Sequence, residues 1–255
     1  MEDHADLIEH LRALGIESGD LLLVHSALSG MACRPETLLD ALLEVIGPEG
    51  TLLVPTFTPS FRHDSPDGTF DLDRTPSSVG YLTELVRTRA DAVRNLDPIH
   101  SFAAIGGRAD EFGRLHARNS YDPNNVLGRL HVADAKIMAV GLDPFGRSMT
   151  FFHYVEQREG VERRGWTYRH EKAFPGTIVV RDKAFSAEYA IHVQNFEDGV
   201  TYDFAPIGEE LDRRGVMHAG TFVDKLFTWG RASDMYEVAG DVIVDEPDQI
   251  YAVDA

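Results

Sequence analysis

The chain of 255 residues is short of cysteine, of basic residues and of long apolar runs. Its one cysteine, Cys33, excludes an internal disulfide and a cysteine-rich metal site. The longest apolar runs, such as Leu21–Val24 and Ile137–Val140, fall far short of the roughly 20 residues that a membrane-spanning helix needs. The N-terminus also lacks the basic and then apolar segments of a secretory signal. These absences predict a soluble, cytoplasmic protein that does not enter a membrane.

Basic residues are outnumbered by acids, with 24 Lys and Arg against 42 Asp and Glu, and the formal net charge is −18. No Lys or Arg follows Arg231. A field of this sign repels nucleic acid and anionic membranes and attracts cations. We therefore expect no nucleic-acid partner. The charge indicates either a cationic small molecule as ligand or simple solubility.

The first 160 residues have the pattern of an α/β protein. Short apolar strands alternate with helices that carry one apolar face, and 43% of all residues are hydrophobic, as in a globular core. The strands are expected at Leu21–Val24, Thr51–Val54, Phe102–Ile105 and Lys136–Val140, and the helices at residues 4–14, from Pro35 to Gly47, and after Ser77 or Ser78. Such alternation is typical of helices packed on both faces of a buried sheet.

The second half has a different pattern. Apolar and polar residues alternate in Thr177–Arg181 and Glu188–Gln194, as in an antiparallel pair. We expect a further helix in Asp203–Leu211 and strands near Val216 and Val242. No linker or repeat divides the chain. The sequence therefore predicts one domain, residues 1–255, built as an α/β/α sandwich with a mixed, mainly parallel central sheet and additional antiparallel strands in its C-terminal part.

An imidazole and a carboxylate lie three residues apart in the apolar segment Thr150–Glu156, as His153 and Glu156. Residues at this spacing share one face of a helix, so both side chains can point into one cavity. A carboxylate beside a histidine favours its charged form and fixes its tautomer, which prepares a general base. The other interpretation is a core helix with two polar residues at its edge.

Polar residues also gather where the predicted strands end. His25 and Ser26 follow the first strand, Thr56 follows the second, and His100 and Ser101 precede the third. Ligands of open α/β sheets bind at an edge where strands end. A single histidine after a strand is usually structural, but three such sites together predict a shared pocket.

Other catalytic patterns do not occur in the sequence. There is no Walker A sequence and no dinucleotide-binding glycine pattern. Ser26 and Ser29 follow a strand without forming a Gly-x-Ser-x-Gly elbow. There are 11 histidines, yet His-Glu-x-x-His is missing, and the His153–Glu156 pair has the reverse order of the di-iron Glu-x-x-His motif. We therefore expect no metal.

Five segments, taken in order, resemble the aminoglycoside 3-N-acetyltransferases, a CoA-dependent family unrelated in fold to the common GNAT acetyltransferases. The segments are Leu23–Leu28, Gly47–Phe57, Phe70–Gly80, Pro98–Gly106 and Thr150–Glu156. They cover the first 160 residues well and the remainder poorly.

The resemblance implies acetyl-CoA as donor and an amino group of an aminoglycoside as acceptor. It assigns the general base to His153 and its partner to Glu156, so that the deprotonated amine attacks the thioester directly. The CoA arm would be held by His25, Ser26, Ala27, Leu28 and Ser29, and by His100, Ser101 and Phe102. Acidic residues near the mouth of the predicted pocket would bind the ammonium groups of the acceptor. The candidates for this role are Asp71, Asp73, Asp97 and Glu171. No metal is implied, and a homodimer is left open.

The chain departs from the family pattern near the acceptor. The family commonly has Ser-x-His-Pro where this chain has Asn95-Leu96-Asp97-Pro98, and residues 157–176 are rich in basic side chains, among them Arg163, Arg164, Arg169 and Lys172. These departures motivate a second hypothesis, the same acyl transfer to an amino sugar or a biosynthetic amine. A CoA-binding protein without catalysis and a metal-dependent hydrolase are the remaining alternatives.

Overall fold

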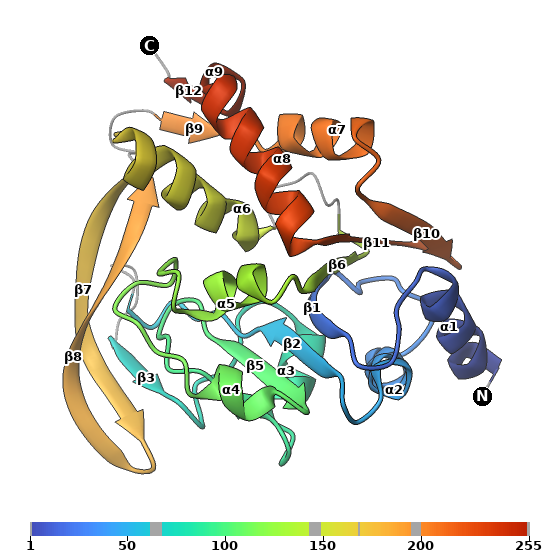
Figure 1. Cartoon of the computed structure of the whole chain (residues 1–255). Coiled ribbons are helices and arrows are strands. Elements are labelled where there is room, and N and C mark those ends of the chain that lie inside the picture. Colours follow the sequence, from blue (N-terminus) through green and yellow to red (C-terminus); the bar gives the residue numbers. More distant parts are fainter. Residues whose placement is uncertain (1, 62–67, 143–148, 168, 195–199, 254–255) are drawn as a thin grey trace.

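The computed structural model describes residues 2–61, 68–142, 149–167, 169–194 and 200–253 (Figure 1). Its centre is a seven-stranded sheet with the strand order β10-β11-β6-β1-β2-β5-β4. The strands are β1 (Leu21–Ser26), β2 (Thr51–Pro55), β4 (Val93–Arg94), β5 (Phe102–Gly106), β6 (Lys136–Val140), β10 (His218–Phe222) and β11 (Lys225–Arg231). In smaller sheets, β3 (Thr69–Asp71) pairs with β7 (Arg169–Val180), β7 pairs with β8 (Lys183–Gln194), and β9 (Val200–Tyr202) pairs with β12 (Tyr251–Val253).

The central sheet is mixed, as predicted, but it is not mainly parallel. β1 is parallel to β2 and to β6, whereas the other neighbouring pairs of this sheet are antiparallel. The error has a physical cause, because a strand buried on both faces reads as a continuous apolar run whichever way it points. The run Phe102–Ile105 therefore gives no sign that β5 runs back against β2. The hairpin of β10 and β11 then adds two antiparallel strands beside β6.

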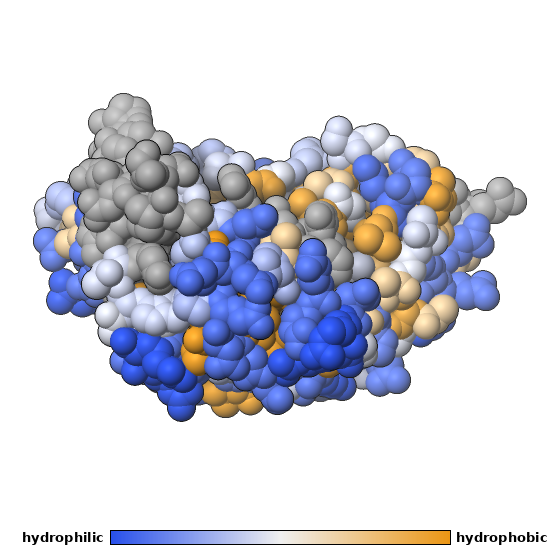
Figure 2. Space-filling model, turned by 90° about the horizontal axis from the view of Figure 1, so that it is seen from above, coloured by the Kyte–Doolittle hydropathy of each residue, from blue (hydrophilic) through white to orange (hydrophobic). Residues whose placement is uncertain are grey.

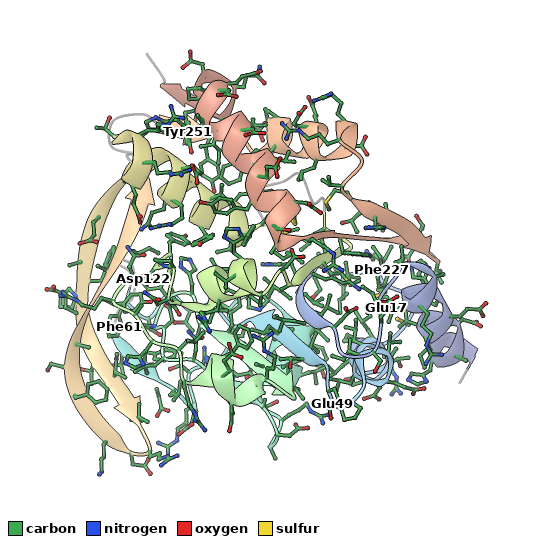
Figure 3. The ribbon with its side chains drawn as sticks, viewed as in Figure 1. Glu17, Glu49, Phe61, Asp122, Phe227 and Tyr251 are labelled. Atoms are coloured by element: carbon green, nitrogen blue, oxygen red, sulfur yellow. The ribbon has the colours of Figure 1, made fainter. Side chains whose placement is uncertain are left out.

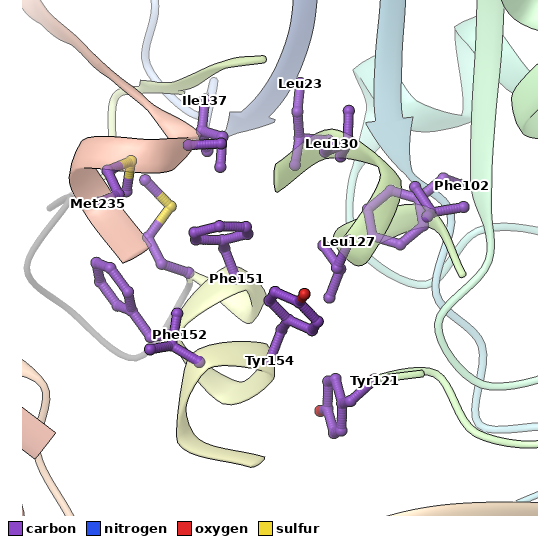
Figure 4. Close-up of a cluster of buried hydrophobic side chains, with 14 of the residues drawn as sticks. Leu23, Phe102, Tyr121, Leu127, Leu130, Ile137, Phe151, Phe152, Tyr154 and Met235 are labelled. Carbon is purple, nitrogen blue, oxygen red and sulfur yellow. The ribbon is translucent and has the colours of Figure 1, made fainter. Parts of the chain in front are cut away.

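Helices cover both faces of this sheet, which confirms the sandwich. Successive side chains of a strand point to opposite faces, so Leu22 of β1 joins one apolar cluster and Leu23 joins the other. The first cluster is covered by α1 (Glu2–Ala13), α2 (Pro35–Ile46) and α3 (Tyr81–Arg87). The second contains residues of α4 (Ala109–Gly113), α5 (Val126–Val132), α6 (Thr150–Val155), α7 (Ala205–Arg213), α8 (Ala232–Asp245) and α9 (Pro247–Ile250). Figure 4 shows part of the second cluster, where Phe151 of α6 lies near Leu127 and Leu130 of α5.

The predicted helices around α1, α2 and α7 are confirmed, and two local predictions are wrong. Val242 lies in α8 rather than in a strand, because the buried residues of this segment recur every three or four positions. α3 begins at Tyr81 after Gly80, so neither Ser77 nor Ser78 supplies its N-cap. Both errors leave the order of the main elements unchanged.

The hairpin of β7 and β8 lies along one side of the molecule, at the left of Figure 1. The antiparallel pairing predicted for this region is confirmed, and it extends over twelve residues of each strand. Besides the pairing of β7 with β3, the hairpin contacts the rest of the chain through the buried side chain of Tyr189 and through Ala190, whose N–H donates to the carbonyl oxygen of Arg118 over 2.6 Å. It therefore forms a wall beside the loop that precedes α5.

The packing of α2 gives a stability prediction. Leu42 is fully buried between α2 and the sheet, whereas its neighbour Leu43 is only partly buried. We expect Leu42→Ala to lower the free energy of unfolding by about 2–5 kcal/mol, because it leaves a cavity. The matched variant Leu43→Ala should lower the free energy of unfolding clearly less. Urea denaturation of both variants measures the difference, and equal losses would contradict the assigned face of α2.

Candidate active site

Four segments meet at one edge of the central sheet because of the strand directions. The parallel strands β1, β2 and β6 end at this edge, and β5, antiparallel to β2, begins there. Ser26 lies opposite Val140, and Pro55 lies opposite Phe102. The polar strand ends therefore lie at one edge of the sheet, which is the arrangement that the predicted shared pocket requires.

The next element after β6 in the described part of the chain is α6, which carries His153. Phe151 and Phe152 are fully buried and anchor α6 in the second apolar cluster. The side chain of His153 keeps 14% of its surface exposed. From Glu156 the helix widens into a π-helix, η1 (Glu156–Glu162), a local change that is frequent at functional sites.

His153 and Glu156 form the pair that their spacing predicts. His153 Nδ1 donates to Glu156 Oε2 over 2.8 Å, and the carboxylate is 1% exposed. The hydroxyl of Tyr251, labelled in Figure 3, donates to Glu156 Oε1 over 2.6 Å. With Nδ1 protonated, the neutral imidazole carries its lone pair on Nε2. One ring nitrogen is thus held by the protein, and the other can accept a proton.

Aromatic side chains from distant segments surround His153. The ring centroids of Phe204, Tyr202 and Tyr121 lie 5.0, 5.2 and 6.2 Å from that of the imidazole. The Tyr202 hydroxyl is 3.5 Å from His153 Nε2. The sequence interpretation missed these rings and Tyr251. Only Tyr121 lies in a segment whose length and polarity mark it, the loop before α5, and the others have no local motif.

His25 occupies the end of β1 and is 4% exposed. It alternates with Val24 and therefore points to the same side of the sheet as Leu23, the side that α6 covers. Burial lowers the pKa of His25 to about 4, so the ring is neutral. Its Nε2 has no hydrogen-bond partner among the described residues. Such a buried nitrogen is a place where a ligand can supply the missing partner.

Ala27 to Ser29, the rest of the first segment expected to hold the CoA arm, form a short turn fixed by hydrogen bonds to backbone atoms. The N–H of Ala27 donates to the carbonyl oxygen of Val140 over 2.8 Å, and Lys225 Nζ donates to that of Ser29 over 2.7 Å. The turn is therefore tied to β6 and to the start of β11.

The second segment expected to hold the CoA arm, His100 to Phe102, buries two of its three side chains. Ser101 is fully buried, and its hydroxyl donates to the carbonyl oxygen of Thr56 over 2.7 Å. Arg94, itself buried, donates to Ser101 Oγ over 3.0 Å. Phe102 is 3% exposed and belongs to the second apolar cluster. The partly exposed ring of this segment is that of His100.

His100 connects the sheet edge to the base through a series of edge-on and tilted ring contacts. Its ring centroid is 4.8 Å from that of Phe57 and 5.6 Å from that of Tyr121. Since Tyr121 also lies beside His153, the rings of His100 and His153 both contact the same aromatic ring.

The acids selected for the acceptor do not all come together. Asp71 lies opposite Val179 of β7, whereas Glu171 precedes Val179 by eight positions on the same strand. At about 3.3 Å per residue, these two acids are roughly 26 Å apart along the strand. Asp71 Oδ1 accepts the N–H groups of Asp73 and Arg74 over 3.0 Å each and so shapes its own turn. Asp73 and Glu171 are exposed.

Asp97 is 1% exposed and therefore does not line the solvent-exposed entrance of a pocket. Its Oδ1 accepts the N–H groups of Ile99 over 3.0 Å and of His100 over 2.7 Å. Burial raises the pKa of Asp97, against the opposing effect of hydrogen bonds from Tyr189 and the loop backbone. This placement argues against the acceptor role expected for Asp97 and gives it a role in shaping the loop of His100.

Among the described residues, no group of three or more His, Cys, Asp or Glu side chains is arranged to hold a metal ion. The helices of the described part include none that is long and apolar enough to span a membrane.

Comparison with known proteins identifies the family. The family model of aminoglycoside 3-N-acetyltransferases matches residues 23–243. This chain belongs to the aminoglycoside 3-N-acetyltransferase family. It is therefore an acyltransferase with acetyl-CoA as donor, as the sequence resemblance implies.

Two kinds of relative accompany this match. Aminoglycoside N(3)-acetyltransferase VII of Streptomyces paromomycinus is 29% identical over 246 residues, which cover 84% of this chain and 82% of that protein. The crystal structure of aminoglycoside acetyltransferase AAC(3)-Xa has a TM-score of 0.80 at 23% identity and covers 95% of this chain and 92% of its own. The complex of AAC-IIIb with CoASH has a TM-score of 0.79 at 22% identity, over 95% of this chain and 96% of its own. The solved structures show the same fold.

The burial of His25 in this acetyltransferase predicts a pH-dependent stability. Its pKa is about 4 in the folded protein, below the ordinary 6.5. The unfolded chain therefore binds a proton more readily between these values, and the stability from a neutral His25 is complete above pH 6.5 and is lost as the pH falls toward 4. We expect the free energy of unfolding, relative to that of His25→Gln, to fall by up to about 3 kcal/mol over this range. Urea titrations at several pH values measure it, and parallel curves would show that His25 is not protected from protonation.

Proposed function

We propose that the protein transfers the acetyl group of acetyl-CoA to an amino group of an aminoglycoside, of the 3-N type, with His153 as general base. The single observation that carries the base assignment is the hydrogen bond of 2.8 Å from His153 Nδ1 to the buried Glu156. Family membership supports the reaction class. The aminoglycoside acceptor follows from the names of the relatives.

The chemistry fits these side chains. An amine that is an ammonium at neutral pH must lose a proton to attack a thioester carbonyl. His153 Nε2 accepts this proton, and the resulting imidazolium is stabilised by the carboxylate on Nδ1. Positioned general-base catalysis contributes about 10²–10⁴-fold to the rate.

Acetyl-CoA supplies the thioester, and the sheet edge fits its pantetheine arm. The buried His25 Nε2 has no partner among the described residues and can bond a polar group of the arm. We propose that the turn from His25 to Ser29 and the ring of His100 contact the arm. Ser101 and Phe102 support these groups from beneath, since both side chains are buried.

The charge of the molecule favours a cationic acceptor. The net charge is −18, and the face shown in Figure 2 is largely hydrophilic. The two reasons for an amino-sugar or biosynthetic acceptor lose weight in the structure. Asp97 is buried, and Arg163 of the basic stretch pairs with Glu159 over 2.6 Å, which neutralises its charge. The aminoglycoside is therefore the first acceptor to test.

We also propose a cytoplasmic location, because a sequence with a single cysteine forms no internal disulfide. A lack of disulfides is typical of proteins of a reducing compartment.

Removal of the base tests the mechanism. We expect His153→Ala to lower kcat by about 10²–10⁴-fold and Glu156→Gln to lower it by about tenfold or more. Both variants should retain CoA binding, because the base acts on the transition state. Thiol release from acetyl-CoA measures turnover, and calorimetry measures CoA binding. The exposed His116 offers the control His116→Ala, which should be fully active. Normal turnover in His153→Ala would disprove the base assignment.

The acceptor and the pH profile give a second test. We expect turnover with kanamycin or gentamicin, unchanged after chelator treatment, and a kcat/KM that rises with pH through one ionisation near neutrality. A profile that is flat from about pH 5.5 to 8 would count against a histidine base. Turnover of an amino sugar such as glucosamine without turnover of either antibiotic would instead select the second hypothesis.

A further inference from the structure

The C-terminal ribbon of β9 and β12 presents two tyrosines to the catalytic pair. Tyr202 of β9 and Tyr251 of β12 lie directly opposite each other in the antiparallel register. Side chains of directly opposed residues lie on the same face of such a pair. Both hydroxyls accordingly reach one site, that of Tyr202 at His153 Nε2 and that of Tyr251 at Glu156 Oε1.

The contact of Tyr251 with Glu156 is short and shielded from water. The hydroxyl donates over 2.6 Å, Tyr251 is 5% exposed and Glu156 is 1% exposed. The ring of Tyr251 packs at an angle of 84° against Trp166, with 5.7 Å between the ring centroids. A buried carboxylate tends to take up a proton unless hydrogen bonds stabilise its charge. Tyr251 supplies such a bond to one oxygen and leaves the other oxygen directed at the imidazole.

We propose that Tyr251 is a positioning residue of the acetyl transfer, which keeps the carboxylate of Glu156 ionised and aimed at His153 Nδ1. The proposal rests on the proposed function of His153. It assigns a catalytic contribution to a strand beyond residue 243, where the match to the family model ends.

The ribbon is held in place by the helices before it. α9 leads directly into β12, and its last residue, Ile250, is 2% exposed. The carbonyl oxygen of Ile250 accepts the N–H of Asp203 over 2.9 Å, which joins the segments that carry the two tyrosines. The position of the phenol on Glu156 is therefore set by the fold rather than by its own strand alone.

A second tyrosine offers a matched control. Tyr236 of α8 donates to Glu159 Oε1 over 2.5 Å, and Glu159 lies three positions after Glu156 on η1. The other oxygen of Glu159 pairs with Arg163 rather than with a histidine. Tyr236→Phe therefore removes the same kind of hydrogen bond from a neighbouring carboxylate that does not contact the base.

The main experiment compares Tyr251→Phe with Tyr236→Phe in the full-length enzyme. We expect Tyr251→Phe to lower kcat about tenfold with little change in KM, the loss that corresponds to one charged hydrogen bond. The acid limb of the pH profile of kcat/KM should move to higher pH. Without the hydrogen bond from Tyr251, the carboxylate of Glu156 takes up a proton more readily, and while ionised it stabilises the imidazolium of His153 more strongly. Tyr236→Phe should leave the limb in place. A limb that stays unchanged in Tyr251→Phe, or that moves equally in both variants, overturns the proposal.

Double variants test whether Tyr251 acts through Glu156. In the Glu156→Gln background, Tyr251→Phe should cause no further loss of kcat, because the group that it orients is already gone. An equal loss in both backgrounds would make Tyr251 an independent, merely structural residue. Among the described residues, Tyr121 and Tyr202 also place titratable groups beside the imidazole, and both stay unchanged in these variants.

Two further measurements complement the main experiment: the first retains the phenol of Tyr251, and the second does not need turnover. Replacement of Tyr251 by 3-fluorotyrosine strengthens the donor and should move the acid limb to lower pH, and a limb that does not move overturns the proposal. Nitrogen-15 NMR of labelled histidines, with His153→Gln for assignment, should show a higher titration midpoint of His153 in Tyr251→Phe, and an unchanged midpoint overturns it. If the wild-type enzyme acetylates no amine, the proposed function fails while the NMR titration still tests the role of Tyr251.

Discussion

The buried carboxylate of Glu156 is the constraint on which the site depends. An ionised group with 1% exposure needs hydrogen-bond donors in place of water. It receives one from His153 on its own helix and one from Tyr251 on the last strand. The first donor needs only local spacing, and the second needs α8, α9 and β12 in their places. The order of the C-terminal third of the chain is therefore coupled to the state of the base.

Local sequence was sufficient wherever a property depends on neighbours along the chain. The buried strands β1, β2 and β6, the start of α2 at Pro35, and the pairing of His153 with Glu156 all follow from spacing and burial. Strand direction was not accessible in this way, because β5 is as apolar as a parallel strand would be. The shared edge could be inferred from the polar residues at the strand ends. The burial of the Ser101 side chain could not, because it depends on hydrogen bonds with Thr56 and with Arg94 of another strand.

Long-range contacts account for most of what sequence reasoning missed at the site. Tyr251 lies 95 positions from Glu156, and nothing near it in the sequence marks its function. The acids chosen for the acceptor are dispersed for a related reason, because Asp71 on β3 lies opposite Val179, eight positions along β7 from Glu171. Charge composition predicts that a cation is attracted to the molecule. It does not say which carboxylates share a wall, because that depends on the curvature and register of β7.

The departure at Asp97 shows how one substitution can be misread without the fold. An acid in place of an imidazole looks in the sequence like a change of acceptor chemistry. In the structure its Oδ1 accepts two successive backbone N–H groups, those of Ile99 and His100, a turn that a short carboxylate forms well. The raised pKa of Asp97 shows that burial works against its charge, so these bonds and the fold around it have to compensate. What changes at this position is the way the loop of His100 is held, while the base and its carboxylate partner lie on a separate element and keep their own support.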